Sequence, residues 1–358
     1  MTASRTRRSF LKDTALFAAG AAAVIPPVQA AASAVSGDPA AGSSPDPSTD
    51  IRIGTLVQSS MNPPAYIKEV VQHGFESFQI TFWKTIGDTD LKRLAGEVRE
   101  ALAGTDAVIS SVAVYGNPLG GRPQDEDTLR SWVELLDTAH LFGCDIVAGF
   151  TGRVIDAPID ESIPRLKEVF EPLAQRAADR GLRIAFENCE MGGNWKTGGW
   201  NIAHNPAAWE LIFDALPYDH IGLEWEPCHQ LVQLIDPLPQ LRKWAPKVFH
   251  LHGKDATVQW DVVRTYGIGA GRPFVHHRTA GFGDTNWTKI IAIMRQAGFK
   301  GSIDIEGWHD PVYKDDLEMT GQVHALNYLS VPNRLRAESF GLIFIFRSTA
   351  SSRCAVPG

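Results

Sequence analysis

Acidic and basic side chains gather at the ends of four apolar segments in the second half of the chain. An unpaired carboxylate is costly to bury, and carboxylates brought together raise one another's pKa. Ordinary salt bridges would satisfy any one of these residues, whereas a divalent cation would satisfy the whole set. Oxygen ligands with one imidazole suit Mn²⁺, our first choice, and also Mg²⁺, Co²⁺ or Zn²⁺. The four ends read Ala185-Phe186-Glu187, Leu223-Glu224-Trp225-Glu226, His250-Leu251-His252 and Asp304-Ile305-Glu306.

These segments belong to a longer alternation of short apolar runs and segments of helical period, which begins at Ile51. Many of the helical segments end at a glycine that can adopt the left-handed cap conformation. The pattern predicts strands over 51–56, 77–82, 108–114, 145–148, 183–187, 221–225, 248–252 and 302–306. It predicts helices over 63–73, 90–103, 125–142, 159–180, 206–215, 239–244, 287–297 and 315–329.

Eight strand–helix units in about 280 residues match the usual size of a (β/α)₈ TIM barrel. A doubly wound sheet would stop at fewer strands, and no Gly-x-Gly-x-x-Gly motif follows the first predicted strand. We therefore expect a single α/β barrel domain over residues 51–330. In such a barrel the carboxyl ends of the strands share one face, where the chemistry takes place.

Four motifs occur in the same order in the xylose-isomerase-like TIM-barrel family, and residues 51–330 resemble that family over their whole length. The family includes sugar phosphate isomerases/epimerases, ketose 3-epimerases and inosose dehydratases. The motifs are Glu187-Asn188-Cys189, Glu226-Pro227-Cys228-His229, His250-Leu251-His252-Gly253-Lys254-Asp255 and Gly281-Phe282-Gly283-Asp284-Thr285-Asn286-Trp287.

The resemblance implies that Glu187, Glu226, His252 and Glu306 hold the metal ion. One departure affects the second ligand, because Glu226 stands where the family usually has aspartate. Glu224 lies two residues earlier, on the same face of the strand, and is a rival for that role.

The resemblance also implies that Glu187 and Glu306 remove and return a proton beside a carbonyl group. His229 and Lys254 would position hydroxyl groups or stabilise negative charge, and Arg278 would contact a sugar oxygen. A salt bridge to Asp255 or another neighbour is an equal alternative for Lys254.

Three functions remain open. The first is isomerisation or epimerisation of a non-phosphorylated carbohydrate or polyol. The second is a lyase reaction of the same family, either elimination from a 3-keto-glycoside or dehydration of an inosose. The third is sugar binding without catalysis. DNA-repair endonucleases share the barrel but use more histidine ligands and a basic surface, so nucleic acid is not an expected partner.

The first 32 residues differ from the rest of the chain. They contain four basic residues and one acidic residue, so the remainder carries a formal charge of −10 within a total of −7. A basic start, an apolar stretch too short to span a membrane, and small residues near Ala30 are typical of an export signal. Arg7 and Arg8, followed by Ser9-Phe10-Leu11-Lys12, resemble the twin-arginine signal. We expect the Tat translocase as a transient partner, a periplasmic or extracytoplasmic location, and a disordered linker over 33–50.

Other segments carry further expectations. The long stretch 256–284 is expected to be a structureless lid, and tryptophans after the strand ends favour a sugar pocket. Cys189 and Cys228 are expected to be free thiols. Residues 331–358 are expected to form an unstructured tail, and homo-oligomerisation stays open.

Overall fold

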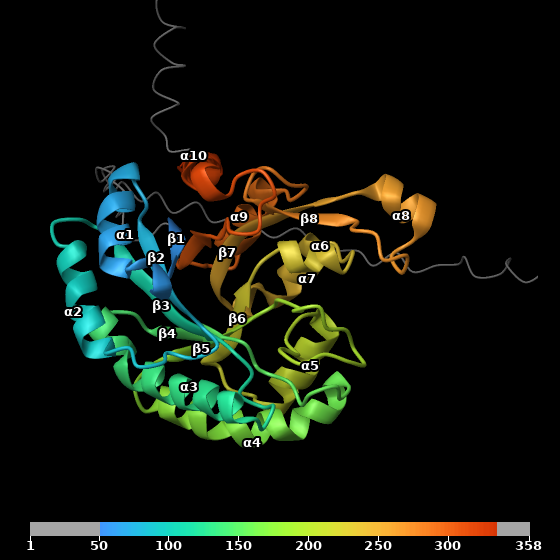
Figure 1. Ribbon diagram of the computed structural model, residues 1–358, viewed down its shortest axis with the longest axis horizontal. Helices are drawn as coiled ribbons and strands as arrows, with labels where there is room; N and C mark the ends of the chain where they lie inside the picture. The colour runs from blue at the N-terminus through green and yellow to red at the C-terminus, as the bar shows by residue number, and fades with distance from the viewer. Residues whose placement is uncertain (1–50, 335–358) are drawn as a thin grey trace, which may run out of the picture. The chain divides into compact units, whose positions relative to one another are not determined.

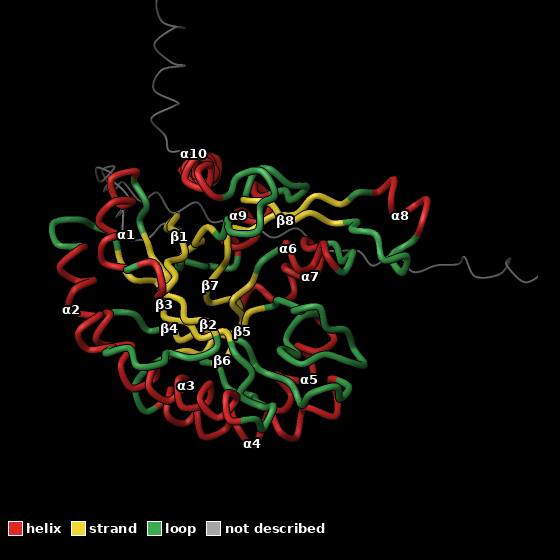
Figure 2. Tube along the Cα trace, viewed as in Figure 1, coloured by secondary structure: helices red, strands yellow, loops and turns green. Residues whose placement is uncertain are grey.

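Eight parallel strands form a closed ring in this computed structural model, which describes residues 51–334 (Figures 1 and 2). Around the ring, each of the strands β1 to β6 pairs with the next, β6 pairs with β7, β7 with β9, and β9 with β1. The strands are β1 (Arg52–Gln58), β2 (Ser77–Trp83), β3 (Val108–Tyr115), β4 (Ile146–Gly149), β5 (Arg183–Glu187), β6 (Ile221–Trp225), β7 (Val248–Val258) and β9 (Ser302–Ile305). The predicted (β/α)₈ TIM barrel is confirmed, with every expected strand present.

Helices follow the strands, and most of them pack around the outside of the ring (Figure 1). They are α1 (Pro63–Val70), α2 (Leu91–Ala101), α3 (Pro123–Phe142), α4 (Ile159–Ala178), α5 (Pro206–Ala215), α6 (Cys228–Val232), α7 (Pro237–Trp244), α8 (Trp260–Tyr266), α9 (Trp287–Gln296) and α10 (Glu318–Arg334). The predicted helices match these within a few residues, except that α6 and α8 were not expected and α10 extends beyond Leu329. No helix in the described part of the chain combines the length and the apolar character needed to cross a membrane.

The main hydrophobic core lies between the strands and the helices, because parallel strands in a barrel are covered on their outer face. Phe170 of α4 shows how the layers meet. Its ring makes edge-on contacts with Trp132 of α3 at 5.4 Å and with Phe186 of β5 at 4.9 Å, measured between ring centroids. All three side chains are fully buried.

Part of the barrel interior is polar. The carboxylate of Asp304 on β9 accepts hydrogen bonds from Ser77 on β2 and Ser110 on β3, and it lies 2.7 Å from Nε2 of His250 on β7. These strands are not all neighbours, so their side chains can meet only inside the ring. Gly54 provides the space, because a Cβ at that position would lie 2.2 Å from Asp304 Oδ1.

The segment 256–284 is ordered, and the prediction of a structureless lid is wrong. Strand β7 continues past the barrel rim to Val258 and pairs antiparallel with β8 (Val275–Thr279), with α8 between them. The three elements form an arm that projects from the ring (Figure 1). The arm forms because the extension of β7 carries edge groups that need a partner strand.

Asp255 anchors the base of this arm. Its Oδ1 accepts hydrogen bonds from the backbone N–H groups of Ala256 (2.8 Å) and Thr285 (3.0 Å), and its Oδ2 accepts from Gly281 N–H and Trp287 Nε1–H at 3.3 Å each. Lys254 therefore does not pair with Asp255, whose carboxylate is occupied by N–H donors. It forms a salt bridge with Glu306 instead, which agrees with the predicted alternative of another neighbour.

Replacing Asp255 by alanine is expected to lower the free energy of unfolding by about 3 kcal/mol, because four N–H donors lose their acceptor in a buried site. Asp255→Asn, which keeps one carbonyl oxygen, should cost less. Urea denaturation of both variants measures the difference. A loss below about 0.5 kcal/mol for the alanine variant would contradict this role.

The predicted signal (1–32) and linker (33–50) lie outside the described residues, as does the part of the predicted tail beyond residue 334. Within the tail, residues 331–334 continue helix α10.

Candidate metal centre

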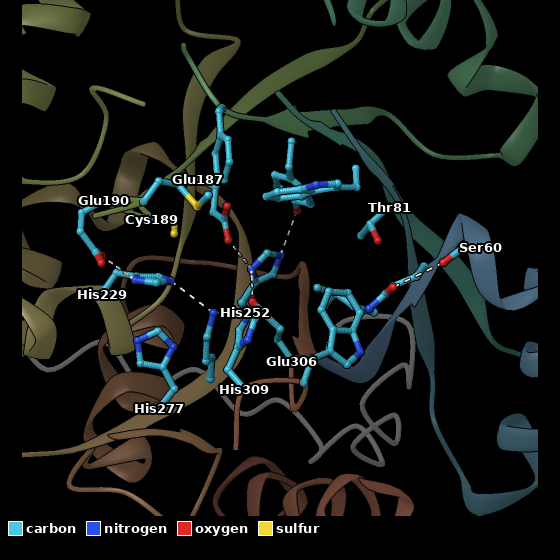
Figure 3. A pocket seen from close by; sticks show the side chains of 18 of the residues that line it. Ser60, Thr81, Glu187, Cys189, Glu190, His229, His252, His277, Glu306 and His309 are labelled. Atoms are coloured by element: carbon cyan, nitrogen blue, oxygen red, sulfur yellow. Dashed lines mark hydrogen bonds and ion pairs between the residues drawn. The ribbon is translucent and has the colours of Figure 1, made fainter. Parts of the chain in front are cut away.

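Four side chains from four successive strands of the ring converge at the carboxyl end of the barrel. Glu187 ends β5, Glu226 follows β6, His252 lies on β7 and Glu306 follows β9. One potential ligand atom of each lies within 4.8 Å of those of the other three, and all four side chains are buried. Figure 3 shows Glu187, His252 and Glu306 directed toward one another. We call these four residues the carboxylate cluster.

Several atoms of the carboxylate cluster lack a hydrogen-bond partner among the described residues. They are Oε2 of Glu226, Nδ1 of His252 and Oε2 of Glu306. His252 Nδ1 lies 3.2 Å from Glu187 Oε1 and 3.3 Å from Glu306 Oε2. Buried polar atoms without partners are rare in native proteins. Oxygen and imidazole donors left free in this way fit a divalent cation.

Glu224 on β6 and Glu226 just after it, the two candidates for the second metal ligand, have different surroundings. Glu224 turns into the barrel, where its carboxylate accepts hydrogen bonds from Gln79 and from the hydroxyl of Tyr115 at 2.7 Å. It also lies 2.9 Å from Nδ1 of His250. Its acceptor capacity is thus already used, whereas Oε2 of Glu226 has no partner among the described residues and Oε1 faces Nε2 of His229 at 2.7 Å.

Glu224 also belongs to a chain of groups that orients His252. Nε2 of His252 lies 2.9 Å from Gln79 Oε1 and 3.3 Å from Glu224 Oε1, and both of these atoms are acceptors. Nε2 therefore carries a proton, and Nδ1 is the nitrogen directed at the carboxylate cluster. His250 extends the chain from Glu224 to Asp304, deep in the barrel.

Replacing Glu224 by glutamine is expected to weaken Mn²⁺ binding about 10- to 100-fold, because a neutral amide orients His252 less firmly than a carboxylate does. Calorimetric titration of the metal-free protein with Mn²⁺ gives the affinity. Glu210→Gln, on the exposed face of α5, is the matched control. A change below twofold in the Glu224 variant would show that the chain does not position His252.

The two glutamates at the edges of the carboxylate cluster have different electrostatic surroundings. Burial raises the pKa of Glu187 to about 7. Burial would also raise the pKa of Glu306, but the ammonium of Lys254, with Nζ 2.6 Å from Glu306 Oε1, holds it well below its usual range. Environments that push two carboxyl pKa values apart are typical of acid–base pairs.

Lys254 and His229 lie beside the carboxylate cluster. Nζ of Lys254 lies 3.2 Å from Nε2 of His229, and that same nitrogen lies 2.7 Å from Glu226 Oε1. Glu190 holds the opposite side of the His229 ring, with Oε2 2.7 Å from Nδ1. Although burial opposes it, this contact with His229 lowers the pKa of Glu190 to about 2.

Arg278 lies on β8 and is separate from this group. Its Nε donates to Oδ2 of Asp310 at 3.1 Å, and its guanidinium lies 5.7 Å from the centroid of the Phe282 ring. Arg278 does not line the cavity above the carboxylate cluster, so the structure does not bring it to the sugar site predicted for it. Cys189 and Cys228 are buried free thiols in the structure, in line with the prediction.

A cavity of about 840 Å³ opens above the carboxylate cluster. Its lining includes Glu187, His229, His252, Lys254 and Glu306, all of which the sequence singled out. Further lining residues were missed, because nothing in the local sequence marks them as parts of a site; they include Trp83, Tyr115, Glu190 and His309. Trp83 and Tyr115 directly follow the predicted strands 77–82 and 108–114, and this position was the available signal.

Comparison with known proteins gives a family match over most of the barrel. A family model described as xylose isomerase-like TIM barrel matches residues 67–325. No curated protein matches the chain significantly.

Solved structures with the same fold differ widely in sequence. The 3-keto-D-glucoside 4-epimerase of E. coli superposes with a TM-score of 0.56 at 16% identity, covering 78% of this chain and 99% of its own. Mannonate dehydratase of Streptococcus suis gives 0.60 at 11% identity, covering 81% and 96%. A xylose isomerase-like TIM barrel protein of Mycobacterium smegmatis, solved in complex with magnesium, gives 0.58 at 17% identity, covering 80% and 98%. At sequence identities of 11–17%, these superpositions show that the chain shares the fold of these proteins.

Proposed function

The chain belongs to the xylose isomerase-like TIM barrel family, and from this premise we propose that it is a divalent-metal-dependent sugar isomerase or epimerase. The substrate is a non-phosphorylated carbohydrate or polyol, and the reaction moves a proton at a carbon next to a carbonyl group. The observation that carries the proposal is the carboxylate cluster, which offers three carboxylates and one imidazole, with two of the glutamates differing in pKa, at the floor of one cavity.

Glu187, Glu226, His252 and Glu306 would hold one divalent ion, with Mn²⁺ as first choice and Mg²⁺, Co²⁺ or Zn²⁺ as alternatives. When bound, such an ion draws electron density from a carbonyl and a neighbouring hydroxyl oxygen and so acidifies the adjacent C–H bond. Nδ1 of His252, presented by the contacts of Nε2 with Gln79 and Glu224, would complete the ligand set.

Glu187 and Glu306 would transfer the proton. They come from β5 and β9, with β6 and β7 between them, so they flank a substrate seated over His252. Glu306, kept anionic by Lys254, would accept the proton, and Glu187 would return one to the other side. A pKa of about 7 suits Glu187 to this exchange near neutral pH.

The lining of the cavity favours a substrate without phosphate. Among the lining residues that the structure describes, Lys254 is the single lysine or arginine, and its ammonium is already paired with Glu306. A phosphate group would need further cationic donors. Free sugars and glycosides are the class that such a cavity suits, and they also fit a protein exported by the Tat pathway, which we propose for this chain from the pattern of residues 1–32.

The second candidate is a lyase that eliminates from a 3-keto-glycoside or dehydrates an inosose, through the same initial loss of a proton. The size of the cavity, about 840 Å³, supports this lyase candidate, because a leaving group needs room beyond the reacting sugar.

Proton NMR in D₂O, with Mn²⁺-loaded protein and a panel of free ketoses, 3-keto-glycosides and inososes, tests the proposal. Deuterium incorporation with formation of an epimer or isomer is the expected result. Release of an aglycone or of water identifies the lyase. Binding without exchange on any of these compounds identifies a sugar-binding protein and overturns the enzymatic proposal.

A further inference from the structure

The mouth of the barrel is divided into a charged half and an uncharged half. The carboxylate cluster and Lys254 come from β5, β6, β7 and β9, which occupy one side of the ring. The strands β1 to β4 occupy the other side, and the cavity-lining residues that they and the turns after them provide carry no charge. These are Leu56, Gln58, Ser59, Ser60, Thr81, Trp83, Thr85, Tyr115 and Phe150.

Trp83 is the most prominent residue of this uncharged half. It ends β2 and is 57% exposed, although it lines the cavity. Its indole stacks on that of Trp200 with 5.5 Å between ring centroids and 26° between planes, and the ammonium of Lys84 lies 5.4 Å from the Trp200 ring. The indole is thus supported from behind and presents free apolar surface to the cavity.

The loop that carries Trp200 is fixed to the catalytic side of the barrel. The side-chain amide of Asn201 donates hydrogen bonds to the carbonyl oxygens of Glu187 and Cys189, both at 2.8 Å. Its carbonyl oxygen accepts from the hydroxyl of Thr151 at 2.6 Å. The aromatic pair is therefore held at a set position relative to the carboxylate cluster, as a binding surface requires.

The size of the cavity also indicates room for more than one sugar ring. Its volume of about 840 Å³ lies in the upper part of the range of roughly 300 to 1,000 Å³ that encloses ligands of drug size. A single six-carbon sugar over the carboxylate cluster would leave the uncharged half empty.

We propose that the uncharged half of the mouth is a second subsite, in which Trp83 stacks against an uncharged ring joined by a glycosidic bond to the reacting sugar. The inference rests on the proposed function and narrows its substrate class to glycosides whose reacting ring carries a keto group. A second sugar ring and an aromatic aglycone share the required chemistry, a flat apolar face without charge. The uncharged polar side chains around Trp83, Gln58, Ser60 and Thr85 among them, can bond ring hydroxyls.

Calorimetric binding to Mn²⁺-loaded full-length protein tests the subsite. The probes are matched methyl and phenyl β-D-glycosides of glucose, galactose and xylose, together with methyl β-cellobioside. For the sugar that binds best, we expect the ring-bearing compound to bind at least tenfold tighter than the methyl glycoside. Trp83→Ala should bring this ratio close to one, and Trp83→Phe should retain most of it. Trp260→Ala, on the projecting arm and outside the cavity lining, is the matched control and should retain the full ratio.

The phenyl glycosides and the cellobioside distinguish the two kinds of ring that the subsite could hold. A gain confined to the phenyl compounds assigns an aromatic aglycone, and a gain with the cellobioside assigns a second sugar. Equal affinities in the unmodified protein, a ratio unchanged in Trp83→Ala, or no binding of any glycoside overturns the subsite. Deuterium exchange on free ketoses is measured separately. If the subsite fails but exchange is observed, the proposed function stands. If the glycosides bind as expected but no exchange is observed, the proposed function fails and the subsite stands.

Discussion

Replacing Glu187 or Glu306 by glutamine is expected to lower the rate of proton exchange about 1,000-fold or more. General acid–base catalysis contributes about 10²- to 10⁴-fold in enzymes, and an amide can neither accept nor return the proton. The glutamine oxygen can still act as a metal ligand, so the loss should exceed any loss of bound metal. Exchange into D₂O, measured together with metal content by atomic spectroscopy, separates the two effects.

Glu168→Gln is the control for these variants, because Glu168 is exposed on α4 and paired with Arg165. It should retain full exchange activity. A Glu187 or Glu306 variant that retains its metal and full activity would refute the assignment of these residues as the acid–base pair.

Addition of Mn²⁺ to metal-free protein is expected to raise its melting temperature by roughly 5 °C. At a free concentration of 100 times Kd, binding to the native state alone adds about 2.7 kcal/mol of stability, and each kcal/mol raises the melting temperature of a large domain by roughly 2 °C. The gain comes from neutralising three buried carboxylates that lie within 4.8 Å of His252 and of one another.

His252→Gln should abolish most of this gain, because it removes the imidazole on which Glu187 and Glu306 converge. His140→Gln, on the outer surface of α3, is the matched control and should shift as the unmodified protein does. An equal shift in the His252 variant would place the ion elsewhere.

The barrel could be predicted from the sequence because its strands are buried on both faces. In β5, for example, the apolar residues Ile184, Ala185 and Phe186 are followed by Glu187 at the open face, so both the strand and its charged end are visible in the sequence. The family resemblance then brings Glu187, Glu226, His252 and Glu306 together, and the structure places all four at one point.

Contacts that depend on strands far apart in sequence could not be predicted. Glu224 and Glu226 have the same residue type and face, and only partners from other strands, such as Tyr115 from β3, show which one is already satisfied. Arg278 was expected at the sugar, but its partner Asp310 lies 32 residues further along the chain. The arm was missed because its second strand, Val275–Thr279, is short and rich in histidine.

The ion pair between Lys254 and Glu306 has a consequence for the valence of the ion that this site accepts. The carboxylates of Glu187, Glu226 and Glu306 bring three negative charges when ionised, and the ammonium of Lys254, itself buried, cancels one of them. His229 and Glu190 form a neighbouring pair that balances its own charge. Two negative charges remain on the carboxylate cluster, and they match the charge of the divalent ion proposed for this site. Lys254 would then act as a counter-ion that matches the centre to a divalent metal.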